Sequence, residues 1–314
     1  MMTRQKIARN PPAELVHFEA TDGTVLPGLL YEPRRKGRTA AIWLHGNGDA
    51  SVFYAQRTNP MGAEFMRRGL TFFPFNNRGA HFVKKLTRAG ARRRKSLTRG
   101  AGYERIRESI ADVEGAVSLL EARGYQRIVL IGHSSGANKI CVYNYYRRRN
   151  PVSAYVLLGG GDDMGLYVEQ WGVRRFRSVL ERCRRELAAG RKWHLAPEAL
   201  TPFPISWMSL YDTINPNGDY NIFPFLEVMR ELGLTRKSLF REFRAIAKPA
   251  LVAYGEHDEF CFGDVEGCMS ILKQQAKRRR NVTFATVEDS DHGFHGKERE
   301  VAELILDWME SGIL

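Results

Sequence analysis

The sequence is poor in cysteine and contains no long apolar run. Its four cysteines, Cys141, Cys183, Cys261 and Cys268, lack the C-x-x-C spacing of zinc or redox sites. We therefore expect reduced thiols in a cytoplasmic protein, with no metal and no cofactor. Because no run of about eighteen apolar residues is present, a membrane-spanning helix is excluded. The N-terminal segment also lacks the apolar stretch of a secretory signal.

Acidic residues are scarce relative to basic ones. The chain holds 35 aspartates and glutamates against 48 lysines and arginines, for a formal net charge of +13. Much of the excess lies in segments 84–99, 174–187 and 273–280, and none of these forms a known nucleic-acid-binding module. We interpret them as a solvated basic surface that could also attract small anionic substrates, and we predict no nucleic-acid partner. We expect the arginine-rich segment 84–99 to be mobile.

Short apolar segments dominate the pattern and predict strands. Segments 13–20 and 25–33, separated by the turn sequence Thr-Asp-Gly, predict an antiparallel pair. Six further runs are almost continuously apolar, which is typical of strands buried on both faces of a parallel sheet. These runs are 39–44, 70–75, 127–131, 154–159, 250–255 and 282–287.

Helical patterns separate these strands. Apolar residues recur at three- and four-residue spacing in segments 60–69, 103–124 and 298–312, and a helix is also predicted over 135–150. Two antiparallel strands followed by alternating strands and helices predict an α/β fold, with a mostly parallel eight-stranded sheet flanked by helices.

One region interrupts this alternation. No strand is predicted between 160 and 249, where an amphipathic helix spans 174–187 and an aromatic-rich stretch follows. We predict a core of residues 1–160 and 248–314, with a helical cap inserted at 161–247. Aromatic residues of the cap are candidates to line a substrate pocket, with Trp207 and Tyr211 preferred. The alternative is that most of them form the cap's own core. The candidates are Trp171, Trp193, Phe203, Trp207, Tyr211, Tyr220 and Phe223.

The sequence Gly132-His133-Ser134-Ser135-Gly136 links a predicted buried strand directly to a helix. It fits the pattern G-x-S-x-G only with Ser134 at the centre. A sharp strand-to-helix turn exposes such a serine above the sheet edge, and glycines flank it because side chains would clash. A serine hydroxyl is a poor nucleophile at neutral pH, so catalysis requires a base and an orienting acid elsewhere in the chain.

Both partners occur at the ends of later strands. Asp258 follows the strand at 250–255, and His292 follows the strand at 282–287. Glu256, Glu259 and Asp264 are alternative acids, and His295 is an alternative base. Position at the strand end favours Asp258, and the context Asp-His-Gly-Phe favours His292.

The order Ser134, Asp258, His292 and the alternating topology together resemble the α/β-hydrolase superfamily over almost the whole chain. The sequence Leu-His-Gly-Asn-Gly at 44–48 is similar to the oxyanion-loop motif of that family. The resemblance implies that the backbone N–H groups of Asn47 and Ser135 form an oxyanion hole.

The resemblance also implies roles for two histidines and for one loop. His45 is expected to brace the oxyanion loop by hydrogen bonding, and His133 is expected to lie beside the active site as a substrate-binding residue. Segment 73–85, with Asn76-Asn77 before Arg-Gly, also resembles a subgroup of small-molecule esterases that includes siderophore esterases.

Carried to function, the resemblance implies a serine hydrolase that cleaves carboxylic esters of small molecules through an acyl-enzyme. Thioester, lactone and amide hydrolysis use the same machinery and stay open. Two alternatives from other classes are a non-catalytic ligand-binding protein on the same fold and an anion-binding protein driven by the basic segments.

Overall fold

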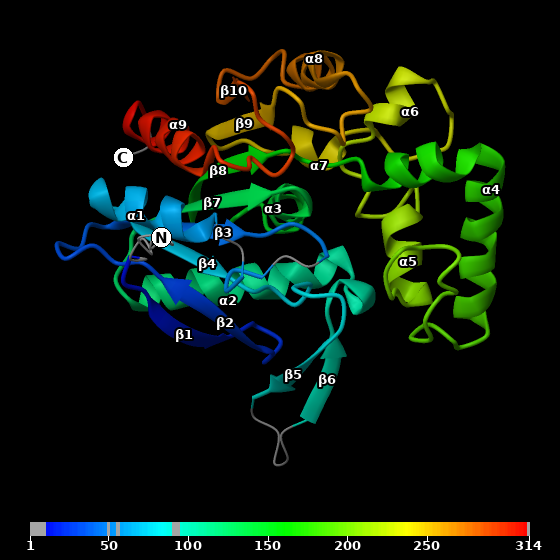
Figure 1. Ribbon diagram of the computed structural model, residues 1–314, viewed down its shortest axis with the longest axis horizontal. Coiled ribbons are helices and arrows are strands. Elements are labelled where there is room, and N and C mark those ends of the chain that lie inside the picture. Colours follow the sequence, from blue (N-terminus) through cyan, green and yellow to red (C-terminus); the bar gives the residue numbers. More distant parts are fainter. Residues whose placement is uncertain (1–10, 49–50, 55–56, 90–94, 313–314) are drawn as a thin grey trace, which may run out of the picture.

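The computed structural model describes residues 11–48, 51–54, 57–89 and 95–312. Figure 1 shows a central twisted sheet with helices against its faces and a group of helices beyond one of its ends. The sheet has eight strands in the order β1-β2-β4-β3-β7-β8-β9-β10. Each of the eight predicted strands is present, and the predicted α/β class with a mostly parallel sheet is confirmed.

The first two strands form an antiparallel edge. β1 (Glu14–Glu19) pairs with β2 (Val25–Leu30) through a turn in which Gly23 has a φ of 82°. A left-handed conformation of this kind costs glycine little, because glycine has no Cβ. In β1 the last four residues alternate between buried and exposed, as expected of a strand with one face in water.

The remaining six strands are parallel. They are β3 (Thr39–Leu44), β4 (Thr71–Phe75), β7 (Arg127–His133), β8 (Val152–Leu158), β9 (Ala250–Gly255) and β10 (Val282–Val287). Every residue of β3, β4 and β9 is buried, which explains their unbroken apolar sequences. The carboxyl ends of parallel strands meet at one sheet edge, so the loops after β3, β7, β9 and β10 converge there.

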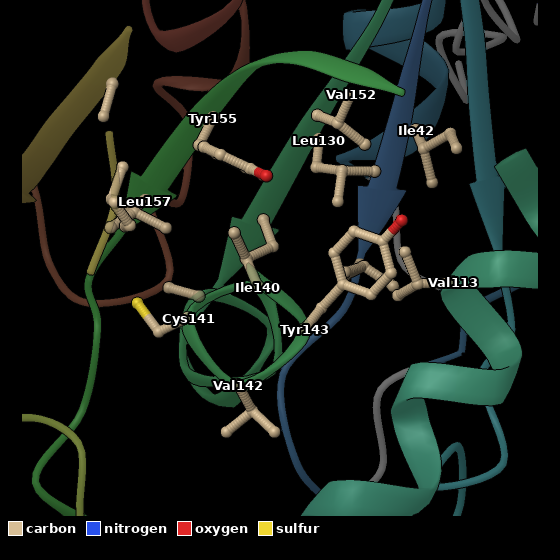
Figure 2. Close-up of a cluster of buried hydrophobic side chains, with 14 of the residues drawn as sticks. Ile42, Val113, Leu130, Ile140, Cys141, Val142, Tyr143, Val152, Tyr155 and Leu157 are labelled. Carbon is tan, nitrogen blue, oxygen red and sulfur yellow. The ribbon is translucent and has the colours of Figure 1, made fainter. Parts of the chain in front are cut away.

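Helices cover both faces of this sheet. The helices α1 (Thr58–Arg67) and α9 (Glu298–Glu310) bury their apolar sides on one face. The other face is covered by α2 (Ser109–Ala122), α3 (Ser135–Tyr146) and α8 (Val265–Gln275). Figure 2 shows Ile140 and Tyr143 of α3 pointing toward the strands. Such burial contributes about 1.5–3 kcal/mol for each large apolar side chain.

The chain between β8 and β9 is helical, as predicted. It contains α4 (Asp163–Ala188), α5 (Trp207–Ile214), α6 (Phe225–Met229) and the short α7 (Arg241–Arg244), and Gly172 interrupts α4 with a φ of 70°. Figure 1 shows α4 and α5 together beside the sheet.

Two different cores serve this helical region. Side chains of α4 and α5 form a separate apolar cluster. By contrast, Phe223, Phe225, Phe240 and Phe243 pack into the cluster that lies on the sheet. The first part of the insertion is therefore a body with its own core, and the second part is joined to the main core.

The basic segment 84–99 contains regular structure where it is described. Strand β5 (Lys84–Arg88) pairs with β6 (Lys95–Arg99) in an antiparallel hairpin, which projects from the body in Figure 1. We expected a mobile segment and predicted no strands here, because each strand has a single apolar residue, Leu86 or Leu97, among lysine, arginine, serine and threonine. Two 3-10 turns, Ala101–Tyr103 and Ile106–Glu108, then lead into α2.

All four cysteines are buried and free, in agreement with the expectation of thiols. None of the helices in the described ranges is long and apolar enough to cross a membrane.

Candidate active site

Ser134 lies on a strained turn between β7 and α3. Its φ of 56° and ψ of −128° are rare for a residue with a side chain, and such conformations cost about 1–3 kcal/mol. The turn is held because the Ser134 N–H donates to the carbonyl of Leu158 at 2.8 Å. A Cβ at Gly132 would lie 2.4 Å from the carbonyl carbon of Gly136, and one at Gly136 would lie 2.2 Å from the Leu44 carbonyl oxygen. Both flanking glycines are therefore required by space.

His292 and Asp258 form a buried pair at the same sheet edge. The Nδ1 atom of His292 lies 3.0 and 2.9 Å from the two carboxylate oxygens of Asp258. The side chains are nearly inaccessible, with exposed fractions of 7% for His292 and 2% for Asp258. Since Nδ1 carries a proton and donates it in a hydrogen bond to the carboxylate, Nε2 is the nitrogen free to accept a proton from a substrate-side group.

The surroundings of this pair fix its orientation. The Phe260 N–H donates to Asp258 at 3.0 Å, and the Phe260 ring contacts the His292 imidazole edge to face at 4.5 Å. Gly159, with a φ of 53°, lies against the pair, and a Cβ there would come within 3.2 Å of both side chains. The strand end of β8 therefore needs a residue without a side chain.

The alternative acids and the alternative base have other partners. Glu259 accepts the backbone N–H of His292 at 3.0 Å, and Glu256 accepts that of Asp289 at 3.0 Å. Asp264 caps α8 through the Gly267 N–H at 2.7 Å. His295 pairs with Asp291, and 72% of its side chain is exposed. Of the candidates, the structure thus pairs His292 with Asp258.

The loop after β3 lies directly against Ser134. A Cβ at Gly46 would approach the Ser134 Cβ to 2.9 Å. In the described part of the chain, neither the Asn47 N–H nor the Ser135 N–H has a hydrogen-bond acceptor within the protein. The Asn47 side chain accepts the Gly48 N–H at 2.8 Å and so helps to shape the loop.

His45 braces this loop, as expected. Its Nε2 accepts the Asn77 N–H at 3.2 Å, so Nδ1 carries the proton and donates to the Gly46 carbonyl at 2.7 Å. Burial, together with the positive charge of Lys139, holds the pKa of His45 well below its ordinary value. This imidazole is therefore neutral, and its hydrogen-bond partners among the described residues are backbone groups.

A buried ion network supports Asn77 from below. Lys139 of α3 is fully buried and lies 2.8 Å from Glu104 and 3.2 Å from the side-chain oxygen of Asn77. Arg78, also buried, binds Asp112 at 2.6 Å. Buried charges need such partners, because an unpaired one is costly. The Arg-Gly segment singled out in the sequence has this structural role.

Ser134 and His292 line one cavity of about 910 Å³ between the sheet edge and the insertion. His45, Asn47 and His133 also line it, so the structure brings these predicted residues together. The aromatic wall consists of Trp43, Tyr54, Phe82, Tyr167, Phe203 and Phe260.

His133 touches both the cavity and the histidine loop. Its Nε2 donates to the His292 carbonyl at 2.7 Å, and its Nδ1 accepts from Arg57 at 3.1 Å. Its ring is stacked with that of Trp43. Burial and the charge of Arg57 hold the pKa of His133 well below its ordinary value. His133, which we expected to bind substrate, thus also holds the backbone of His292 through a hydrogen bond.

Trp207 and Tyr211 do not line the cavity. Trp207 is 4% exposed and belongs to the apolar cluster of α4 and α5, and Tyr211 packs against the same cluster. The face of α5 that carries Trp207, Leu210 and Ile214 is turned toward α4. The structure therefore separates these two predicted substrate-binding residues from Ser134, in line with the alternative that they form the insertion's own core.

Other residues line the cavity that the sequence did not single out. Arg57 precedes α1, and Asp163, Tyr167 and Gln170 come from the first turns of α4. Burial raises the pKa of Asp163 to about 6. In the sequence, Asp163 could have been found only from its place after Gly159-Gly160-Gly161 at a strand end. No sequence feature pointed to Arg57.

The described residues that could bind a metal do not gather in this cavity. Among the described residues, a single group of three side chains could hold an ion, namely Glu256, His257 and Asp289. All three are exposed, and none of them lines the cavity.

Comparison with known proteins agrees with this fold. A family model described as "Alpha/beta hydrolase family" matches residues 41–304, whereas no curated protein sequence matches the chain.

Several solved structures are similar in fold. Est1E from Butyrivibrio proteoclasticus with ferulic acid bound has 13% identity and a TM-score of 0.62, with 95% of this chain and 99% of that chain covered. The esterase domain of a Rhodothermus marinus protein has 17% identity and a TM-score of 0.55, covering 95% and 98%. The Pyrococcus furiosus esterase Pf2001 has 15% identity and a TM-score of 0.56, covering 96% and 91%. At these identities the likeness concerns the fold.

Proposed function

The chain belongs to the alpha/beta hydrolase family, and from this premise we propose that it is a serine esterase acting on carboxylic esters of small molecules. One observation carries the proposal: Ser134, on its strained turn, lines the same cavity as His292, whose Nδ1 is bound by the Asp258 carboxylate. A nucleophile, a base and an orienting acid are the three parts that acyl transfer by serine requires.

In the proposed first half-reaction, the Ser134 hydroxyl attacks the ester carbonyl. His292 Nε2 takes the hydroxyl proton, and Asp258 stabilises the imidazolium and keeps Nδ1 protonated. The tetrahedral oxyanion accepts the N–H groups of Asn47 and Ser135, and one such donor contributes roughly 3–4 kcal/mol to transition-state stabilisation. His292 then returns the proton to the leaving alcohol, and the acyl group stays on Ser134.

In the second half-reaction, water attacks the acyl-enzyme along the same route. His292 removes the water proton and returns it to Ser134 as the acid leaves. Tyr167, Phe203 and Phe260 give the cavity an apolar wall that suits the acyl or aromatic part of a substrate. We also propose that residues 161–247 act as the cap that sets this specificity. Two facts support this: α4 lines the cavity, and the α4–α5 body has its own core.

The test is hydrolysis of 4-nitrophenyl esters of increasing acyl length by the wild type and by Ser134→Ala. We expect turnover by the wild type and background rates for the variant, with both proteins unfolding at similar temperatures. Equal turnover by the two proteins would contradict the assignment of Ser134. Ser135→Ala is the matched control, because it removes the neighbouring hydroxyl and keeps the backbone N–H; it should retain turnover.

A further inference from the structure

Arg57 is the single lysine or arginine among the residues that line the catalytic cavity in the described part of the chain. It directly precedes α1, and its Nη1 donates to His133 Nδ1 at 3.1 Å. His133 is in turn adjacent to Ser134 in sequence, and its ring lies 5.0 Å from that of His292. One imidazole therefore separates the guanidinium from the base of the proposed triad.

The charge of Arg57 has no counter-ion among the residues that the structure describes. Among the described residues, no carboxylate oxygen lies within 4.0 Å of its guanidinium, and the acceptor that it does have, His133, is a neutral ring. Burial lowers the pKa of Arg57, which Glu298 and Asp291 partly oppose, but an arginine stays protonated under all ordinary conditions. The cavity thus contains a permanent, half-buried positive charge.

Buried cations elsewhere in the molecule are paired differently. Arg78 binds two carboxylates, and Lys139 binds Glu104. Since a guanidinium carries five N–H donors in a planar fork, the bond to His133 leaves most of the Arg57 donors for another partner. Its fork geometry matches a carboxylate, which can accept two parallel hydrogen bonds.

From these contacts we propose that Arg57 binds a carboxylate of the substrate, so that the preferred substrates are esters carrying a second, ionised carboxyl group. This inference rests on the proposed esterase function and names its substrate class. The other charged side chain on the cavity wall, Asp163, would repel an anion when ionised and so directs it toward Arg57. The aromatic wall then contacts the uncharged part of the substrate.

A purely structural role for Arg57 gives a different expectation. If Arg57 only orients His133, its removal lowers the turnover of charged and uncharged esters by the same factor. If it binds the substrate carboxylate, its removal changes the ratio of the two rates. The ratio of kcat/KM values for a matched pair of esters therefore separates the two roles.

The experiment compares mono(4-nitrophenyl) glutarate with its uncharged methyl ester, which places the carboxylate on the acyl side. A second pair, the butyrate esters of 4-hydroxybenzoate and of methyl 4-hydroxybenzoate, places it on the alcohol side. The proteins are the wild type, Arg57→Gln, Arg57→Lys, and the control Arg67→Gln, which removes the same charge from the other end of α1. Arg67 pairs with Glu64 and does not line the cavity.

We expect the wild type to prefer the carboxylate member of at least one pair, less strongly as salt is added. In Arg57→Gln this preference should fall about 10- to 100-fold, the usual effect of losing a charge-assisted hydrogen bond. The preference of Arg57→Lys should lie between those of the wild type and Arg57→Gln, because lysine keeps the positive charge but lacks the planar fork of donors. Arg67→Gln should keep the wild-type ratio.

Two results would overturn the inference alone: no carboxylate preference by a wild type that hydrolyses the uncharged esters, or the same ratio in Arg57→Gln as in the wild type. A wild type that hydrolyses neither member of either pair would instead contradict the proposed esterase function, and this inference with it.

Discussion

His45 and His292 lie on either side of Ser134, and both are almost completely buried, yet their surroundings are opposite. His45 follows β3, bonds only to the Gly46 carbonyl and the Asn77 N–H, and has Lys139 nearby. His292 follows β10 and bonds through Nδ1 to both oxygens of Asp258. Burial and the nearby Lys139 keep the first ring neutral, whereas the second ring donates a hydrogen bond from Nδ1 to a carboxylate.

The difference shows that burial alone does not make a histidine a base. Burial disfavours the imidazolium, and nearby cations add to this effect, so His45 is suited to hold a loop in one shape. The Asp258 carboxylate lies at Nδ1 of His292, where it would stabilise the positive charge that forms if His292 takes a proton from Ser134 as we propose. The following predictions test this contrast between the two rings.

The largest effect is expected for Asp258→Asn, which removes the carboxylate from His292. An amide at this position favours the wrong tautomer, so kcat should fall about 10,000-fold with little change in fold. Steady-state kinetics on an ester that the wild type hydrolyses measures this. Glu259→Gln is the control, since Glu259 accepts the backbone N–H of His292 and not a ring N–H. A larger loss of kcat in Glu259→Gln than in Asp258→Asn would assign the role of orienting acid to Glu259.

The second effect is expected for His45→Ala, chiefly on stability. The Gly46 carbonyl and the Asn77 N–H would lose a buried partner, which costs about 1–3 kcal/mol for each group. Urea unfolding at pH 7.5 measures the free energy of unfolding. Native His45 resists protonation, whereas in the unfolded chain it binds a proton below its ordinary pKa. Its contribution should therefore shrink as the pH falls through that value.

The outcome that would contradict this role is a His45→Ala protein of unchanged stability whose activity is lost completely. His45 would then act in the chemistry and not as a brace.

A smaller effect is expected for His133→Phe. Phenylalanine keeps a ring beside Trp43 but removes the donor to the His292 carbonyl and the acceptor for Arg57. We expect kcat to fall roughly tenfold, because His292 loses one hydrogen bond that orients its loop while its bond to Asp258 remains. A loss as large as that of Asp258→Asn would mean that His133 itself transfers a proton.

The smallest effect is expected for His295→Ala. His295 is exposed and pairs with Asp291 on the surface, and exposed ion pairs contribute little. We expect less than about a twofold change in kcat, and a change of less than about 1 kcal/mol in the free energy of unfolding. A large loss of activity would exchange the roles given to His292 and His295.

The sheet and the edge that carries the candidate site could be predicted because their signals are local. Buried parallel strands require continuous apolar runs, and the turn at Ser134 requires glycines on both sides. The chain order of strand ends then predicts that Asp258 and His292 lie close together, because parallel strands bring their carboxyl ends to one edge; the structure pairs these two side chains.

The walls of the cavity could not be predicted in the same way. Whether Trp207 faces the cavity or α4 depends on how two helices pack, which its own segment does not encode. The strands of the 84–99 hairpin lack apolar alternation, and α8 overlaps a basic segment that we interpreted only as surface. Arg57 lines the site because α1 begins there in space, although Arg57 is far from Ser134 in sequence.

The central claim is that Ser134 becomes acylated. The most direct measurement is the mass of the intact protein after treatment with a fluorophosphonate, followed by mapping of the modified peptide. The account predicts one adduct, on Ser134, and none in Ser134→Ala, with much slower labelling in Asp258→Asn. An adduct on another residue, or equal labelling of the wild type and Ser134→Ala, would contradict it.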